Sequence, residues 1–290
     1  MMIERDLNPT EGSEAGINTT GTPEQSPLSA YERAAAEGSD PRCIPQHLVS
    51  HPPVGSEIVT PPYSEEHNEN WTSLFNRQMN LLPGKAGAAF LAGVQTLGMD
   101  ESGIPSLANL SAALQGATDW KVARIPGLLH EKDFFDLLSR RIFPSTDYIR
   151  EKHELDYTPA PDCFHDMFGH MPMLTNSSVA DFYHLFGQSA LHATGIQRTY
   201  LERLHWFTIE FGLIRQEEGL RVFGAGIISS KDEIAHALSD KVEVRDFSLE
   251  SVIQQDYEVW HLQPILFALE SFDQLVDEFR FWSNRQGIAA

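Results

Sequence analysis

The amino-acid composition of the chain changes sharply near residue 60, and this change limits where a folded core can form. Residues 1–60 contain no Phe and no Trp, and Tyr31 is their only aromatic residue. Their 3 basic and 9 acidic side chains give them a net charge of −6. Because such a segment has too little apolar surface to offset the conformational entropy lost on ordering, we expect residues 1–60 to form a disordered, acidic and proline-rich N-terminal tail.

Residues 61–285 show the hydrophobic periodicity of a folded domain. Trp71, Leu74 and Phe75, for example, recur at helical spacing, and Pro105 and Gly116 bracket another helical pattern. The pattern predicts helices over residues 65–82, 85–97, 106–115, 131–141, 179–191, 200–215, 230–239, 249–256 and 267–282. It predicts a short strand over 120–124 and a turn or short strand over 222–228. The fold class that we expect is therefore mainly α with a few short β-strands.

Charge and cysteine content exclude several classes of protein. The chain has 21 basic and 41 acidic side chains, a net charge of −20, so it lacks the clustered Lys and Arg that nucleic acid or an anionic membrane surface requires. No apolar run approaches the roughly 20 residues of a membrane span, and the first residues lack the pattern of a signal peptide. Two cysteines, Cys43 and Cys163, are too few for a disulfide scaffold. We therefore expect a cytoplasmic protein that acts on a small molecule.

Three ionisable side chains lie in strongly apolar surroundings. His165 and His170 alternate with Phe and Met in PDCFHDMFGHMPML, and Glu210 lies within LHWFTIEFGLI. A buried, unpaired charge costs several kcal/mol. A divalent metal ion bound by all three side chains would remove this cost for each of them.

The spacing of the two histidines leaves the kind of site open. Residues five apart on an ideal helix are about 140° apart, so His165 and His170 do not share a regular helical face. Pro172 disfavours helix at the residue before it, so we expect the helix to end near His170, which then reaches His165 from irregular backbone. Two His and one carboxylate suit a non-haem iron site with three open positions. A zinc site and a pair of satisfied core histidines beside a salt-bridged Glu remain alternatives.

Three motifs carry a resemblance to a known family. The segment from Pro161 to Leu174, preceded by YTP, is similar to the PEPD-xx-H-[ED]-LxGHxP signature of the pterin-dependent aromatic amino acid hydroxylases. WFTIEFGLI resembles their WFTVEFGL, and FGAGIISS resembles their YGAGLLSS. The resemblance implies their catalytic-domain fold over residues 61–285 and a cytoplasmic monooxygenase that uses Fe(II), a tetrahydropterin and dioxygen. The length is similar to that of the short bacterial phenylalanine 4-hydroxylases, which implies conversion of L-phenylalanine to L-tyrosine.

The resemblance also implies roles for individual residues. The iron ligands of the family match His165, His170 and Glu210. The residues that bind the amino acid match Arg150, Thr158, Trp206, Gly226 and Ser229. The residues that bind the pterin match Gly127, Leu129, Phe134 and Asp166.

Two departures from the family pattern bear on the reaction. His205 stands where the family usually has Tyr, near the iron and the pterin, which makes it an expected modulator of catalysis. Ala160 stands where many members have Glu, and its presence removes an expected partner of Arg150. Tryptophan 5-hydroxylation, phenylalanine 3-hydroxylation and a non-catalytic metal- or pterin-binding protein therefore remain alternatives. We expect a monomer, because no long C-terminal tetramerisation helix follows, and the family chemistry implies a pterin-recycling enzyme as a partner.

Overall fold

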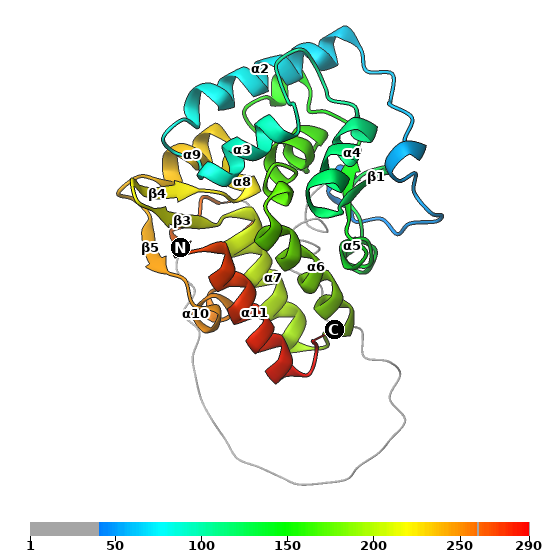
Figure 1. Cartoon of the computed structure of the whole chain (residues 1–290). Coiled ribbons are helices and arrows are strands. Elements are labelled where there is room, and N and C mark those ends of the chain that lie inside the picture. Colours follow the sequence, from blue (N-terminus) through cyan, green and yellow to red (C-terminus); the bar gives the residue numbers. More distant parts are fainter. Residues whose placement is uncertain (1–40, 260, 290) are drawn as a thin grey trace, which may run out of the picture.

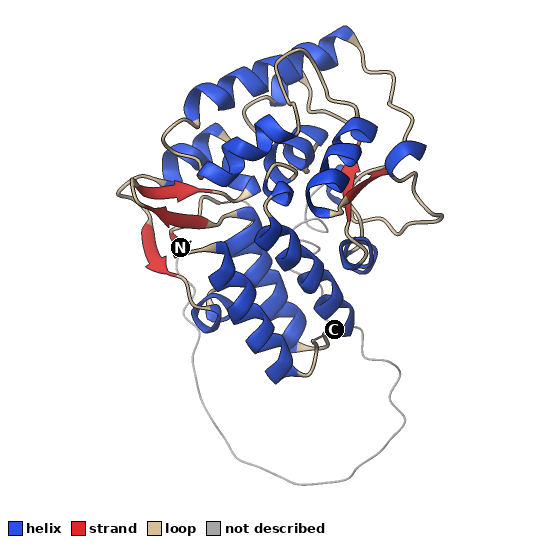
Figure 2. Ribbon diagram, in the orientation of Figure 1, coloured by secondary structure: helices blue, strands red, loops and turns tan. Residues whose placement is uncertain are grey.

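The computed structural model of the chain describes residues 41–259 and 261–289. Helices dominate the described part, as the sequence predicts (Figures 1 and 2). The α-helices are α2 (Glu65–Leu81), α3 (Ala88–Thr96), α4 (Leu107–Thr118), α5 (Glu131–Ser139), α6 (Ser177–His192), α7 (Ile196–His205), α8 (Ala225–Ile228), α9 (Lys231–Ala237), α10 (Leu249–Gln254) and α11 (Phe272–Gln286). Short 3₁₀ turns are η1 (Pro41–Cys43), η2 (Gly55–Glu57), η3 (Lys152–Glu154) and η5 (Met173–Thr175), and two π-helical segments are η4 (His165–His170) and η6 (Trp206–Glu210).

Side-chain caps explain where several helices begin. The Ser64 hydroxyl accepts from the backbone N–H of His67 at the start of α2, and the Asn176 side chain accepts from Val179 at the start of α6. Ser271 caps α11 in the same way. Such caps satisfy backbone donors that the first turn leaves without a partner. Together α6, α7 and α11 lie side by side in the lower half of the view in Figure 1.

The strands form two small sheets. Strands β1 (Lys121–Ile125) and β2 (Ile142–Thr146) pair in parallel, and a four-stranded sheet has the order β4-β3-β6-β5. Its members are β3 (Leu213–Gln216), β4 (Gly219–Val222), β5 (Glu243–Asp246) and β6 (Ile265–Leu269). Strands β3 and β4 form an antiparallel hairpin, whereas β6 runs parallel to both β3 and β5.

Three predicted elements are partly wrong. The helix predicted over 200–215 ends before Gly212, and residues 213–215 belong to β3. Gly212 permits this break, since a Cβ there would lie 2.3 Å from the Thr208 carbonyl oxygen. The segment 222–228 is mostly helix α8. The helix predicted over 267–282 begins too early, because residues 267–269 belong to β6 and α11 starts only at Phe272. A short apolar run such as that of β6 fits a buried strand and a buried helix equally well, so periodicity alone does not separate them.

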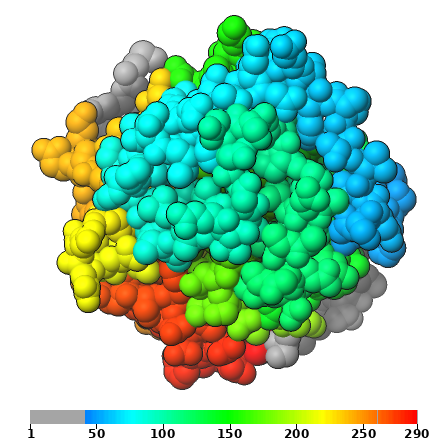
Figure 3. Space-filling model, turned by 45° about the horizontal axis from the view of Figure 1, so that its top comes forward, coloured from blue at the N-terminus to red at the C-terminus, as the bar shows by residue number. Residues whose placement is uncertain are grey.

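Residues 41–60, which the composition assigns to the tail, lie against the surface of the domain (Figure 3). Arg42 forms a bidentate pair with Glu154, and Cys43 is buried. The backbone of Gln46 bonds to residues 128 and 130 beyond β1. The contact therefore depends on backbone bonds, side-chain hydrogen bonds and ion pairs, which composition does not reveal. The tail stays a prediction for residues 1–40, which lie outside the described part of the chain.

Within the described residues, no helix combines the length and the apolar character needed to cross a membrane. Most of the buried apolar residues form one large cluster, in which Trp71, Phe164 and Phe168 are fully buried. Phe164 stacks on Phe168, and Trp71 meets Phe164 edge to face. These ring contacts fix the position of η4 in the core.

Candidate metal centre

Two π-helical segments carry the three predicted metal ligands. His165 and His170 are the first and last residues of η4, and Glu210 is the last residue of η6. A π-turn bonds residue i to i+5, as the Phe211 N–H does to the Trp206 carbonyl at 2.8 Å, so residues five apart come to the same side of the helix. Widened turns of this kind occur frequently at functional sites.

The helix ends at His170, as expected, but His170 does not reach His165 from irregular backbone, because it is the last residue of the π-helical segment. Met171 keeps right-handed helical angles although Pro172 follows it. Burial of Met167 and Phe168 against the core outweighs the local preference of a residue before proline. The histidines meet because the helix widens and not because it breaks.

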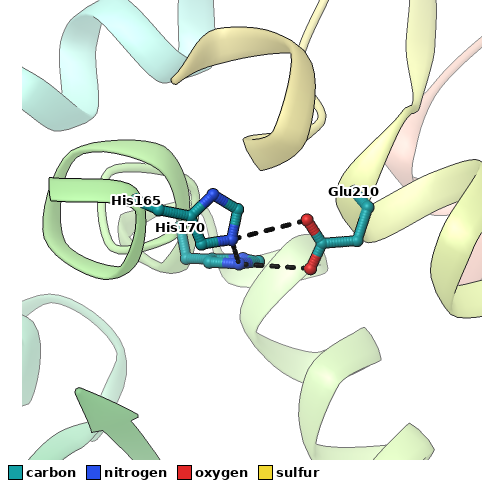
Figure 4. A group of neighbouring side chains, drawn as sticks. All are labelled: His165, His170 and Glu210. Carbon is teal, nitrogen blue, oxygen red and sulfur yellow. Dashed lines mark hydrogen bonds and ion pairs between the residues drawn. The ribbon is translucent and has the colours of Figure 1, made fainter. Parts of the chain in front are cut away.

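The three side chains converge on one point (Figure 4). The Nε2 atoms of His165 and His170 lie 3.0 Å apart. Glu210 Oε2 lies 3.6 Å from His165 Nε2, and Glu210 Oε1 lies 3.3 Å from His170 Nε2. Ligand bonds of about 2.1 Å at right angles place donor atoms about 3.0 Å apart, so these separations fit one divalent ion. The three donors occupy one side of that position and leave the other side open, as in a facial triad.

The hydrogen bonds of the two rings direct their Nε2 atoms to the same point. Ser229 Oγ donates to the Ala225 carbonyl at 2.8 Å, so it accepts from His165 Nδ1–H at 3.0 Å. His170 Nδ1 is 3.0 Å from the hydroxyl of Tyr183. With both Nδ1 atoms protonated, the two Nε2 lone pairs and the carboxylate face one another. A metal cation satisfies all three, and the residues present therefore fit a bound iron ion.

Burial sets the charges of the cluster. It lowers the pKa of His165 to about 4, so this ring is neutral at pH 7. Burial by itself would raise the pKa of Glu210, but the adjacent His170 and His165 outweigh it and hold that pKa well below its usual value. A neutral imidazole and an ionised carboxylate are the forms that bind a divalent metal.

A cavity of about 430 Å³ opens beside the cluster. Its wall contains every site residue that the sequence predicts: Gly127, Leu129, Phe134, Arg150, Thr158, His165, Asp166, His170, His205, Trp206, Glu210, Gly226 and Ser229. These residues come from η4, η6, α5, α7 and α8 and from the loops after β1 and β2. The structure thus brings together side chains separated by up to about a hundred positions.

Polar and aromatic groups on one part of the wall suit an aromatic amino acid. Arg150 is buried and forms a bidentate pair with Asp162, at 2.8 Å from Nε and 2.9 Å from Nη2. Among the described residues, the Nη1 hydrogens have no acceptor, so they stay available to an anion. Trp206 stacks on Tyr257 with ring centres 4.4 Å apart. The Thr158 hydroxyl donates to the Ala160 carbonyl.

Another part of the wall is aromatic and contains His205. Its ring lies 6.0 Å from that of Phe134 and 5.7 Å from that of Phe186. Burial lowers the pKa of His205 to about 4, and its Nε2 is buried without a hydrogen-bond partner among the described residues. Nearby, Asp166 accepts from the Thr146 N–H, and burial raises the pKa of its carboxyl well above the usual value.

Four residues at the site were missed by sequence reasoning. They are Asp162 beside Arg150, Tyr183 beside His170, Tyr257 beside Trp206, and Glu233 in the cavity wall. Asp162 stood next to the recognised histidines and was detectable as a buried carboxylate. Tyr183 and Tyr257 lie outside the three motifs of the resemblance, so nothing in the sequence singled them out.

Comparison with known proteins decides the family. The model of the biopterin-dependent aromatic amino acid hydroxylases matches residues 45–287. The chain belongs to this family. The geometry of its site agrees with membership in the family, because the three motifs of the resemblance all contribute residues to the wall of one cavity.

Relatives of this hydroxylase chain include bacterial proteins named phenylalanine-4-hydroxylase. That of Ralstonia nicotianae is 39% identical over 247 residues, which cover 84% of this chain and 77% of the relative. A crystal structure of the Chromobacterium violaceum phenylalanine hydroxylase with iron(III) and oxidised 7,8-dihydrobiopterin matches with a TM-score of 0.74 at 39% identity, covering 78% of this chain and 83% of that one. A tyrosine 3-monooxygenase from Drosophila melanogaster is 36% identical over 79% of this chain, which covers 40% of that protein.

Proposed function

We propose that this hydroxylase converts L-phenylalanine to L-tyrosine, with Fe(II), a tetrahydropterin and dioxygen. The observation that carries the proposal is the His165–His170–Glu210 cluster at the wall of a cavity large enough for an amino acid and a pterin ring. The bacterial relatives that cover most of the chain are phenylalanine-4-hydroxylases, and one of them has a structure with iron and dihydrobiopterin.

The first part of the proposal concerns the metal. His165, His170 and Glu210 would hold iron through Nε2, Nε2 and a carboxylate oxygen, with Ser229 and Tyr183 orienting the two rings. When bound, iron and the reduced pterin supply the activation of dioxygen. The protein contributes position and the exclusion of water, because Phe and Met side chains surround the cluster.

The second part assigns the substrate. The free Nη1 hydrogens of Arg150 would bind the carboxylate, since a guanidinium suits a planar anion. Ala160 has no carboxylate to pair with Arg150, and Asp162 is the partner instead. Its two bonds to Nε and Nη2 fix the guanidinium and leave Nη1 for the substrate. Trp206, stacked on Tyr257, would pack against the aromatic ring, while Thr158, Gly226 and Ser229 line the amino-acid end of the cavity.

The third part assigns the pterin. Phe134 would stack on its ring, Gly127 and Leu129 would supply backbone contacts, and Asp166 would reach it through water. His205 Nε2, which has no hydrogen-bond partner among the described residues, would bond to a bound molecule and so modulate coupling between pterin oxidation and hydroxylation. Changing His205 to Tyr, the usual residue of the family, would alter the ratio of tyrosine formed to pterin oxidised.

The cellular context is also a proposal. We infer a cytoplasmic monomer, and both cysteines are buried free thiols, as a reducing compartment favours. A pterin-recycling enzyme would act beside it, because each turnover oxidises one pterin. Sedimentation of the iron-loaded protein tests the monomer.

A product assay tests the proposed function. The purified chain is loaded with Fe(II), supplied with a tetrahydropterin in air, and offered phenylalanine, tyrosine and tryptophan separately. Para-tyrosine from phenylalanine supports the proposal. Meta-tyrosine or hydroxytryptophan would replace it with one of the alternative hydroxylations. Iron binding without any pterin oxidation would favour a non-catalytic binding protein.

A further inference from the structure

The cavity wall contains one acidic side chain, Glu233, to which the proposed function gives no role. Glu233 lies on α9, one turn after Ser229 and Ser230, and lines the cavity. Its backbone N–H donates to the Ser230 hydroxyl, which caps α9. Among the described residues, its carboxylate has no hydrogen-bond donor and no basic side chain within ion-pair distance.

The other acidic groups in the cavity wall all have partners. Glu131 pairs with Arg198, and Asp156 pairs with both Arg77 and Lys231. Asp166 accepts from Thr146, Glu210 belongs to the metal cluster, and Glu202 also has a partner. Within the described part of the chain, Glu233 is therefore the carboxylate of the cavity wall with neither a hydrogen bond nor an ion pair.

The surroundings of Glu233 favour a cation. The Glu233 side chain is half-buried, and burial together with the adjacent Asp232 raises the pKa of its carboxyl to about 7. A buried carboxylate without a partner is costly, and a positive charge placed beside it removes much of that cost. The nearby Lys231 and Arg77 do not meet this need, because both are bound to Asp156.

We propose that Glu233 binds the α-ammonium group of the amino-acid substrate. The inference rests on the proposed function, which supplies the zwitterion. Such a substrate presents one anion, one cation and one aromatic ring, and the cavity offers Arg150, Glu233 and the Trp206–Tyr257 stack. Glu233 thus selects amino acids over aromatic acids that lack the ammonium group.

Binding of a matched pair of ligands tests the inference. Iron-loaded protein is titrated with L-phenylalanine and with 3-phenylpropanoate, which keeps the ring and the carboxylate but lacks the ammonium group. We expect Glu233→Gln to weaken phenylalanine binding about tenfold or more, since hydrogen bonds to charged groups contribute about 1.5–3 kcal/mol. We expect it to leave 3-phenylpropanoate binding unchanged or tighter. Asp240→Asn, which removes an exposed charge outside the cavity wall, is the control and should leave the ratio of the two affinities unchanged.

The outcomes separate this inference from the proposed function. If Glu233→Gln weakens both ligands equally or neither of them, the inference is overturned, while tyrosine formation by the wild-type chain still supports the function. If the wild-type chain discriminates between the ligands through Glu233 but forms no tyrosine, the inference stands and the function fails. Wild-type protein that binds neither ligand overturns both. Glu233→Asp, which keeps the charge, should retain part of the preference and serves if the Gln variant does not fold.

Discussion

The hydroxyl of Tyr183 lies 3.0 Å from Nδ1 of His170, and both groups are buried. The Tyr183 ring is fixed by edge contact with Trp120 and by Phe143, which also contacts the His170 ring. A partner that binds the second nitrogen of a metal-ligating histidine fixes its orientation and tautomer. Tyr183 therefore acts on the metal through His170, as a positioning residue.

We predict that Tyr183→Phe weakens Fe(II) binding about tenfold or more, the usual effect of removing such a partner. The substitution keeps the ring and removes only the hydroxyl. Metal affinity is measured by competition with a chelator, independently of turnover. Tyr200→Phe, on α7 and outside the cavity wall, is the control and should leave the affinity unchanged.

Arg150→Ala is expected to raise KM for phenylalanine much more than KM for the pterin. It removes the proposed partner of the substrate carboxylate and also leaves the buried Asp162 without its counter-ion, which should cost about 3–5 kcal/mol of stability. Arg124→Ala is the control. It breaks a half-buried ion pair with Asp147 outside the cavity wall, so it shows how the loss of an ion pair alone affects the two KM values. Equal changes in the two KM values would remove Arg150 from the substrate site.

Stability should depend on pH through Glu233. The pKa of the Glu233 carboxyl is raised from 4.5 to about 7, mainly by burial. Between these pH values the carboxyl is ionised in the unfolded chain but still protonated in the folded chain. The folded state is therefore destabilised as pH rises through this range, by at most about 3 kcal/mol above pH 7. Glu233→Gln removes the effect, so its gain in unfolding free energy should be larger at pH 8 than at pH 5. Metal-free protein unfolded by urea at both pH values provides the measurement, and an equal gain at each would contradict the assignment.

The N-terminal contact gives a further prediction. A chain that begins at residue 41 keeps the Arg42–Glu154 pair, the buried Cys43 and the backbone bonds of Gln46, whereas a chain that begins at residue 58 loses them all. We expect the shorter chain to melt several degrees lower, because the lost bonds are worth about 1 kcal/mol each. Identical melting temperatures would show that the contact does not contribute to stability.

Much of the fold was predictable because its helices are amphipathic. Helix α2 needs only the spacing of Trp71, Leu74 and Phe75 and the cap at Ser64 to be recognised. Strands β2 and β5 were missed because each is short and takes its partners from distant parts of the chain. The end of η4 at His170 agrees with the expectation drawn from Pro172, but its π-helical form was beyond the sequence, because residue periodicity does not show that a helical turn is widened.

The site was predictable to the extent that motifs carry it. His165, His170 and Glu210 stand out as ionisable side chains among apolar residues, and the resemblance to the family led to the other predicted residues of the cavity wall. Tyr183 and Glu233 were not found, because a Tyr on an amphipathic helix and a Glu in the first turn of a helix are ordinary features. Only the fold shows that one lies against His170 and the other faces the cavity.

Iron content tests the central claim most directly. The account predicts that the wild-type chain retains about one iron per chain after desalting. Glu210→Gln, which keeps the size of the side chain and removes its charge, should lose most of that iron and all tyrosine formation. Glu218→Gln, an exposed glutamate in the turn between β3 and β4, should behave as the wild type. A Glu210→Gln variant that keeps its iron and its full turnover would contradict the account.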